Sequence, residues 1–203
     1  MEAISKGQAI EISRGSDPYL RGYIGPLQIW PLQLIYHDIA WYLIYEYCSN
    51  GHLAVGRVNR FKNYCKILTC HRSLDAQHMI LHNAHKLIEN GWGFYLGDPA
   101  QQQAELQCQL DFETVKVRFF PPVMAFIEEG KRRHHSQKIK VCKDSTTAKP
   151  KYLDYSVKLP PRSLNEFSFW VFRFMDNAQV LSPLHLVEKH SSAAQALVFR
   201  YCK

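Results

Sequence analysis

The stretch PLQLIYHDIAWYLIYEYCSNGHLAVGRVNR, residues 31–60, decides the fold of the first half of this 203-residue chain. Apolar runs flank Asn50-Gly51, and an Asn-Gly pair between two such runs is a strong hairpin signal because both residues accept the positive φ of a tight turn. The run before this turn begins with WYL at 41–43, and the run after it ends in RVNR at 57–60. The stretch therefore predicts three consecutive strands joined by short turns.

The residues on either side continue this pattern as far as position 72. Further strand-sized segments occur at 8–13, 19–24, 28–36 and 61–68. About five short strands with frequent turns are typical of a small closed barrel. Residues 73–91 differ, because their apolar side chains recur at helical spacing and the segment ends in Asn-Gly, a helix C-terminal signal. Gly, Pro and three consecutive glutamines at 101–103 then indicate a linker.

The second half of the chain mixes strands with helices. Polar and apolar residues alternate at 105–120, which predicts a strand, and Pro121-Pro122 opens a short helix. The next elements are two strands, an amphipathic helix, a strand and the start of a short final helix, at 138–142, 151–159, 164–176, 180–183 and 184–189. A strand–helix–strand–strand–helix–strand order is characteristic of a ferredoxin-like α+β domain. The chain is thus expected to be mainly β plus α+β, with a barrel at 1–72, a helix and linker at 73–104, and an α+β domain at 105–203.

Composition narrows the classes of function. A net charge of +7 favours acidic partners such as nucleic acids or nucleotides, although a basic surface can also simply keep a protein in solution. No apolar run is long enough to span a membrane and no secretory signal is visible, so we expect a cytoplasmic protein without a membrane partner. The six cysteines form no CxxC pair, and the spacing of Cys65, Cys70 and His71 does not suit zinc. We expect reduced thiols, no metal and no cofactor.

Sequence motifs of catalysis are missing as well. The chain contains no GxSxG, P-loop, HExxH or glycine-rich dinucleotide motif. We therefore expect a binding protein and not an enzyme.

Strand alternation divides residues 41–43 between two faces. Trp41 and Leu43 share one face, which predicts that both are core residues, and Tyr42 lies on the other face. In the next strand Arg57 and Arg60 point to opposite faces unless a bulge intervenes. Arginine offers a planar fork of donors that matches phosphate. Tyr42, Arg57 and Arg60 therefore form either a phosphodiester site or a set of surface salt bridges.

Several of these motifs resemble the WYL domain. Its pattern of Pro-Leu-x-Leu, Trp-Tyr-Leu and Phe-Arg-Leu-Asp-Arg is similar to the residues at 31–34, 41–43 and 56–60. In the last motif both arginines are kept, while Gly56 stands in place of the Phe and Asn59 in place of the Asp. The second half is similar to the WYL C-terminal extension, WCX, at VRF 117–119, Pro122, HSQKI 135–139, WV 170–171 and VLSP 180–183.

The resemblance implies an Sm-like five-stranded barrel followed by the extension. It implies the ligand-sensing region of a bacterial transcriptional regulator, which binds single-stranded nucleic acid or a nucleotide-like anion and forms a homodimer. Family members act in DNA-damage responses, phage defence and CRISPR-associated regulation. Such regulators usually begin with a winged helix-turn-helix, whereas this sequence opens at the lead into the barrel. We expect a DNA-binding domain either in a longer form of the chain or in a partner.

Further residues extend the expected site. Arg14 and Arg21, on the first two predicted strands, could complete a ring of positive charge. His135 and Gln137 match a His-x-Gln of the extension, and they either bind a nucleotide or cap a strand. The alternative function is an oligomerisation or scaffold module whose basic face contacts a protein partner and binds no ligand.

Overall fold

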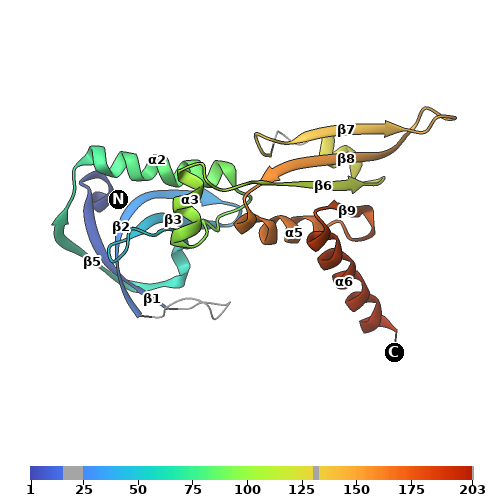
Figure 1. Cartoon of the computed structure of the whole chain (residues 1–203). Coiled ribbons are helices and arrows are strands. Elements are labelled where there is room, and N and C mark those ends of the chain that lie inside the picture. The colour runs from blue at the N-terminus through green and yellow to red at the C-terminus, as the bar shows by residue number, and fades with distance from the viewer. Residues whose placement is uncertain (16–24, 130–132, 203) are drawn as a thin grey trace. The chain divides into compact units, whose positions relative to one another are not determined.

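The computed structural model describes residues 1–15, 25–129 and 133–202. The chain divides into two compact units. Unit 1 consists of Met1–Ile88 with Phe94–Gln109, and unit 2 consists of Glu89–Gly93 with Leu110–Lys203. Each unit contains one antiparallel sheet, so the chain has a mixed α+β fold (Figure 1).

Unit 1 is built on a five-stranded sheet in the order β4-β3-β2-β1-β5. After a short helix α1 (Glu2–Ser5), its strands are β1 (Gln8–Arg14), β2 (Gly25–His37), β3 (Ala40–Tyr47), β4 (Leu53–Arg57) and β5 (Phe61–His71). The predicted hairpin at Asn50-Gly51 joins β3 to β4, and Gly51 has a φ of +70°. The strand expected at 19–24 lies outside the described residues.

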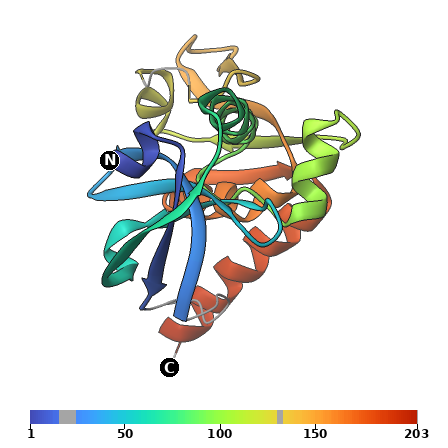
Figure 2. The same cartoon turned by 90° about the vertical axis from the view of Figure 1, so that its left-hand side faces the viewer.

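The sheet is strongly curved, as Figures 1 and 2 show. In the described part of unit 1, however, no strand pairing joins β4 to β5. The strand that was expected to continue to Arg60 ends at Arg57, because Val58–Arg60 form a turn of 3-10 helix, η1. This turn redirects the chain into β5, whose residues are mostly exposed. The pairing therefore leaves the sheet open where the sequence predicted a closed barrel.

The two faces of this sheet contribute to two separate cores. The α1-side core contains Ala3, Ile10, Ile12, Ile29, Leu43 and Tyr45. The α2-side core contains Leu32, Ile44, Leu53, Ala84, Leu87 and Leu96. Helix α2 (Leu74–Asn90) supplies two members of the second core, as its helical spacing predicts. Consecutive residues of β3 thus belong to different cores.

The segment expected to be a linker contains a capped helix, α3 (Pro99–Leu106). Asp98 accepts a hydrogen bond from the Gln101 backbone N–H at 2.8 Å, and the Gln101 side chain accepts one from the Asp98 N–H at 3.1 Å. This is a capping box with proline at the first helical position. Gln102 is buried and bonds both backbone groups of Leu53, at 3.0 and 2.7 Å. Gln102 therefore ties α3 to the first residue of β4 within unit 1.

Unit 2 has a four-stranded sheet in the order β7-β8-β6-β9. Its elements are β6 (Glu113–Phe119), α4 (Met124–Glu129), β7 (Lys138–Lys143), β8 (Pro150–Leu159), η2 (Pro161–Ser163), α5 (Leu164–Phe172), η3 (Met175–Asn177), β9 (Ala178–Ser182) and α6 (Leu184–Tyr201). The strands and helices α4 and α5 follow the order that the sequence predicts. One face of the sheet packs on α4 and α5 around Phe119, Tyr155 and Phe167.

Helix α6 is much longer than the short helix expected at 184–189. Its first turns pack against unit 2 through Leu186, which is buried in the core. The residues that follow, SSAAQALVFRY at 191–201, are almost all exposed. Alanine, glutamine, leucine and arginine favour a helix even without packing, which accounts for the extension. Figure 1 shows the C-terminal part of α6 extending beyond the rest of unit 2.

Candidate functional site

The structure brings Tyr42 and Arg57 together as a cross-strand pair. Tyr42 on β3 lies directly opposite Arg57 on β4. Directly opposite residues of antiparallel strands place their side chains on the same face of the sheet. That face carries the α2-side core, because Tyr42 alternates with Ile44, and Arg57 with Val55 and Leu53. The hairpin register therefore joins two of the residues predicted for the site.

Arg57 carries an unusual polar group. Its Nε is buried and has no hydrogen-bond partner among the described residues. Buried donors are nearly always paired, and an unpaired one costs about 1–3 kcal/mol. The guanidinium of Arg57 is therefore held in a position where an added acceptor would lower its free energy.

Aromatic rings surround the Tyr42 side of this pair. The Phe94 ring lies 5.0 Å from the Tyr42 ring and 4.9 Å from the His37 ring, and Tyr42 and His37 are 6.5 Å apart. Phe94 belongs to unit 1 although it lies 52 positions beyond Tyr42 in the sequence. The sequence reasoning treated His37 as a turn residue and did not select Phe94. Planar rings beside an arginine fork suit a ligand that has both an aromatic base and a phosphate.

Trp41 does not lie in the core as predicted. Its side chain is 54% exposed, whereas Leu43 is only 6% exposed and belongs to the α1-side core. Trp41 is paired with Tyr36 near the tip of the β2–β3 hairpin, and the two rings are 5.4 Å apart. Alternation places Trp41 and Leu43 on the same face, but Trp41 lies beyond the end of the core that covers this face.

Arg14 does not join the Tyr42–Arg57 pair. Arg14 alternates with Ile10 and Ile12 of the α1-side core, and its charge acts on the buried Tyr45 of the same core. Burial raises the pKa of Tyr45, so its hydroxyl stays protonated. Arg14 thus lies on the opposite sheet face from Arg57. Arg60 belongs to η1, where its carbonyl accepts a hydrogen bond from the Gly15 N–H. Arg21 lies outside the described residues.

His135 and Gln137 lie in unit 2, in the segment before β7. Gln137 Oε1 accepts hydrogen bonds from the backbone N–H of Arg133 at 2.7 Å and of His134 at 3.1 Å, and from the Tyr155 hydroxyl at 3.3 Å. These contacts favour the strand-capping interpretation of Gln137. The exposed His135 contacts the Glu89 carbonyl through Nδ1 at 3.2 Å.

Two further properties concern the described part of the chain. No group of three or more His, Cys, Asp or Glu side chains in it is arranged to hold a metal ion. None of the helices described there combines the length and the apolar character that crossing a membrane requires.

Comparison with known proteins gives one family match. A model of the WCX domain matches residues 111–198, which include all four strands of unit 2. Among solved structures, the proteasome accessory factor B/C (PafBC) of Arthrobacter aurescens is similar, with 15% sequence identity and a TM-score of 0.36. The alignment covers 100% of this chain and 26% of that chain, so this chain spans about a quarter of its length. No curated protein matches the sequence significantly.

Proposed function

Because its WCX domain at residues 111–198 makes this chain a member of the WYL/WCX family, we propose that it is the ligand-sensing and dimerisation region of a bacterial transcriptional regulator. The protein acts in the cytoplasm. DNA is bound by a winged helix-turn-helix, which belongs either to the same full-length chain or to a partner. The protein acts by binding a ligand and has no catalytic role. The curved sheet of unit 1, in the order β4-β3-β2-β1-β5, is an open variant of the Sm-like barrel.

The ligand is single-stranded nucleic acid or a nucleotide-like anion. The observation that carries this proposal is the pairing of Tyr42 with Arg57, whose buried Nε has no acceptor among the described residues. The oxygens of a phosphodiester only accept hydrogen bonds, and two of them can accept the two parallel N–H bonds of a guanidinium group. The rings of Tyr42 and Phe94 provide stacking surfaces for a base. Both parts of a nucleotide therefore find complementary groups in unit 1.

Sensing follows from differential affinity. A ligand shifts a conformational equilibrium only as far as it binds one state more tightly than the other. The buried Nε of Arg57 has no acceptor among the described residues, and a bound phosphate supplies one when the side chain turns. The bound state is favoured by this gain, and the DNA-binding domain responds to the shift.

Arg57→Ala is expected to weaken the binding of a labelled oligothymidylate of about four nucleotides roughly ten- to a hundredfold, the range for losing a hydrogen bond to a charged group. Arg57→Lys keeps the charge but loses the fork, so it should recover only part of the affinity. Fluorescence anisotropy over a salt series measures both. Losing one phosphate contact lowers the salt slope by about 0.7.

Lys66→Ala is the matched control for this experiment, because Lys66 is an exposed cation on β5. It removes the same charge from unit 1 without touching the Tyr42–Arg57 pair. Equal loss of affinity in Lys66→Ala and Arg57→Ala would show general charge attraction only. Wild-type affinity in Arg57→Ala would refute the site.

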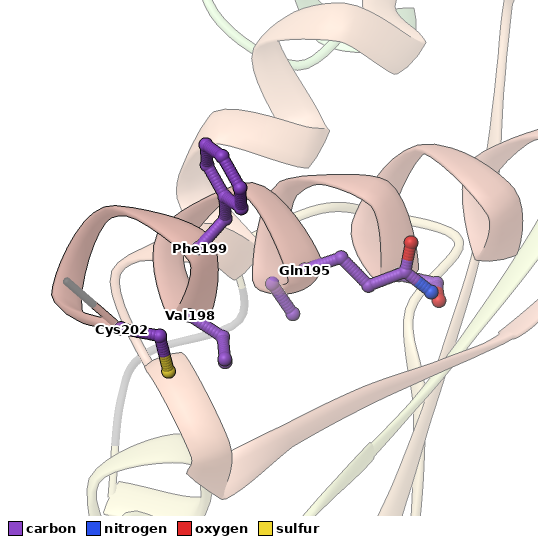
Figure 3. Close-up of a pocket in the computed structure, with 6 residues that line it drawn as sticks. Gln195, Val198, Phe199 and Cys202 are labelled. Carbon is purple, nitrogen blue, oxygen red and sulfur yellow. The ribbon is translucent and has the colours of Figure 1, made fainter.

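The dimerisation part of the proposal is supported by the exposed end of α6. Val198 is 61% exposed, Phe199 81% and Tyr201 82%. Figure 3 shows Phe199 on one side of the helix and Val198 with Cys202 on another, so apolar groups face solvent in several directions. Large apolar side chains exposed together on a soluble protein often mark a contact with another protein. A second copy of the chain is the partner that covers it.

Phe199→Glu is therefore expected to convert a dimer into a monomer, because a carboxylate cannot be buried unpaired in an apolar interface. Sedimentation equilibrium measures the mass. Leu184→Glu is the control, since Leu184 is 72% exposed at the other end of the same helix. A monomeric wild-type protein, or dimers in both variants, would contradict the proposed interface.

The alternative function, a scaffold that contacts a protein partner and binds no ligand, is supported by the same exposed helix. It predicts that oligonucleotides do not bind at any salt concentration. The salt series described above separates the two functions.

A further inference from the structure

The sheet of unit 2 has one covered face and one open face. Val115, Val117 and Phe119 of β6, and Leu153, Tyr155 and Val157 of β8, point to the covered face, where they are at most 1% exposed. The residues between them necessarily point to the other face. Helices α4, α5 and the first turns of α6 all contribute to the core on the covered side. The opposite side of the sheet carries polar side chains.

Positive charge predominates on this open face. Its cations are Lys116 and Arg118 on β6, Lys138 and Lys140 on β7, and Lys158 on β8. The four lysines are exposed, and Arg118 retains 28% exposure. Asp154 is the single acidic residue that alternation places among them in the described strands. Four lysines, none of them in an ion pair with another described residue, therefore dominate the local field.

The strand register sets the spacing of these cations. Lys116 and Lys138 lie on either side of Ser156, and Arg118 and Lys140 lie on either side of Asp154. Two strand spacings separate the cations of each row by about 10 Å, and successive rows follow the strands at about 7 Å. The result is a regular grid of positive charge on a surface that the hydrogen bonds of the sheet hold rigid.

One corner of the grid is organised by an arginine. Arg118 makes a two-pronged contact with Asp154, with Nε–Oδ1 at 2.8 Å and Nη2–Oδ2 at 3.1 Å. Its guanidinium lies 3.7 Å from the centre of the Tyr152 ring. Two fixed donor–acceptor bonds and a ring contact leave the fork little freedom, so its plane is oriented before any ligand arrives.

We propose that this open face binds the backbone of single-stranded nucleic acid, as a second site separate from the Tyr42–Arg57 pair. Lys116, Lys138, Lys140 and Lys158 neutralise successive phosphates, and a base stacks at the Arg118–Tyr152 corner. Single strands are bound elsewhere by positively charged surfaces that combine backbone contacts with planar stacking groups, including the faces of four-stranded sheets. The inference goes beyond the sensor site, because it concerns a different unit and a longer ligand.

Protection of a sheet edge does not account for this charge. Lysines often occur on edge strands, where they prevent pairing with another chain. β7 is such an edge, which could explain Lys138 and Lys140. β6 and β8 are the central strands, and their backbone groups are already paired on both sides. Lys116 and Lys158 therefore require another explanation, and an anionic ligand across the face provides it.

The test is the double variant Lys116→Gln/Lys158→Gln in the full chain, with a labelled oligothymidylate of about a dozen nucleotides as the probe, within the usual site sizes. Each phosphate contact to a single strand contributes about 0.7 to the salt slope, so the slope should fall by about 1.4. At 0.1 M salt this corresponds to roughly 25-fold weaker binding. Fluorescence anisotropy and circular dichroism report binding and folding.

Lys62→Gln/Lys66→Gln is the matched control, because both lysines are exposed on β5 of unit 1. It should leave the slope within about 0.3 of wild type, well below the change of one contact. An unchanged slope in the Lys116/Lys158 variant, an equal drop in the control, or no binding by the wild type would overturn the proposal. Loss in Arg57→Ala with wild-type binding in the Lys116/Lys158 variant would retain the sensor site and reject this one. The reverse result would do the opposite.

Discussion

Phe119→Ala is expected to lower the free energy of unfolding of unit 2 by about 3–5 kcal/mol, the cost of truncating a fully buried phenylalanine. Phe119 is 0% exposed on the central strand β6. Its ring lies 5.2 Å from Phe174, 5.7 Å from Trp170 and 6.3 Å from Tyr155. Removal of the ring leaves a cavity among rigid neighbours that cannot collapse to fill it. A loss of this size is a large part of the 5–15 kcal/mol typical of a whole domain.

Hydrogen exchange at increasing urea concentrations measures the loss of unfolding free energy separately for each unit. Amides of β6 and β8 should exchange faster in the Phe119→Ala variant, while amides of β2 and β3 in unit 1 stay close to wild type. Phe169→Ala is the control, because Phe169 is 55% exposed on α5 and should cost less than about 1 kcal/mol. A similar loss in both variants would contradict the assignment of Phe119 to the centre of the core.

The sequence correctly predicted those elements whose structure depends on residues close to one another along the chain. The Asn50-Gly51 hairpin follows from backbone preferences at two positions, and the alternation at 113–119 follows from one buried face. The capping box of α3 was also present, as Asp98-Pro99 with Gln101, but the glutamine run was interpreted as a linker. A start signal of that kind outweighs low complexity over three residues.

Long-range features were beyond the sequence. Alternation assigns Trp41 and Leu43 to the same face, but it does not say how far the core extends along the strand. Whether β4 and β5 pair depends on the turn at η1. Residues such as Val58 are common in strands, so the sequence does not indicate a turn there. The sheet was therefore predicted to close, and Trp41 was predicted to be buried.

The candidate site divides in the same way. Tyr42 and Arg57 flank a predicted hairpin, so their proximity could be inferred from the turn between them. Phe94 reaches Tyr42 only through the packing of the segment that precedes α3, which no local pattern encodes. Arg14 and Arg57 lie on opposite faces of a curved sheet, so these two residues cannot both belong to the expected ring of charge. Strand alternation within one strand does not show which faces of distant strands correspond.

Glu46→Ala is expected to destabilise unit 1 by about 3 kcal/mol, because it leaves a mostly buried guanidinium without its counter-charge. Glu46 and Arg72 form an ion pair whose side chains are only 12% and 16% exposed. Arg72 also lies 4.8 Å from the centre of the Trp30 ring and donates from Nε to Gln77 Oε1 at 3.3 Å. Its Nη2 has no hydrogen-bond partner among the described residues, so the carboxylate is the main group that compensates the buried charge.

A double-mutant cycle distinguishes a missing counter-charge from lost packing. Arg72→Met alone should cost a similar amount, since it leaves the Glu46 carboxylate unpaired in its turn. The double variant Glu46→Leu/Arg72→Met buries no charge and fills most of the volume, so its loss should be smaller than the sum of the single losses by at least about 1 kcal/mol. Urea unfolding read by tryptophan fluorescence, to which Trp30 beside Arg72 contributes, gives all three values. If the losses instead add within about 0.5 kcal/mol, the pair contributes no coupling, and the stability of this region comes from side-chain packing alone.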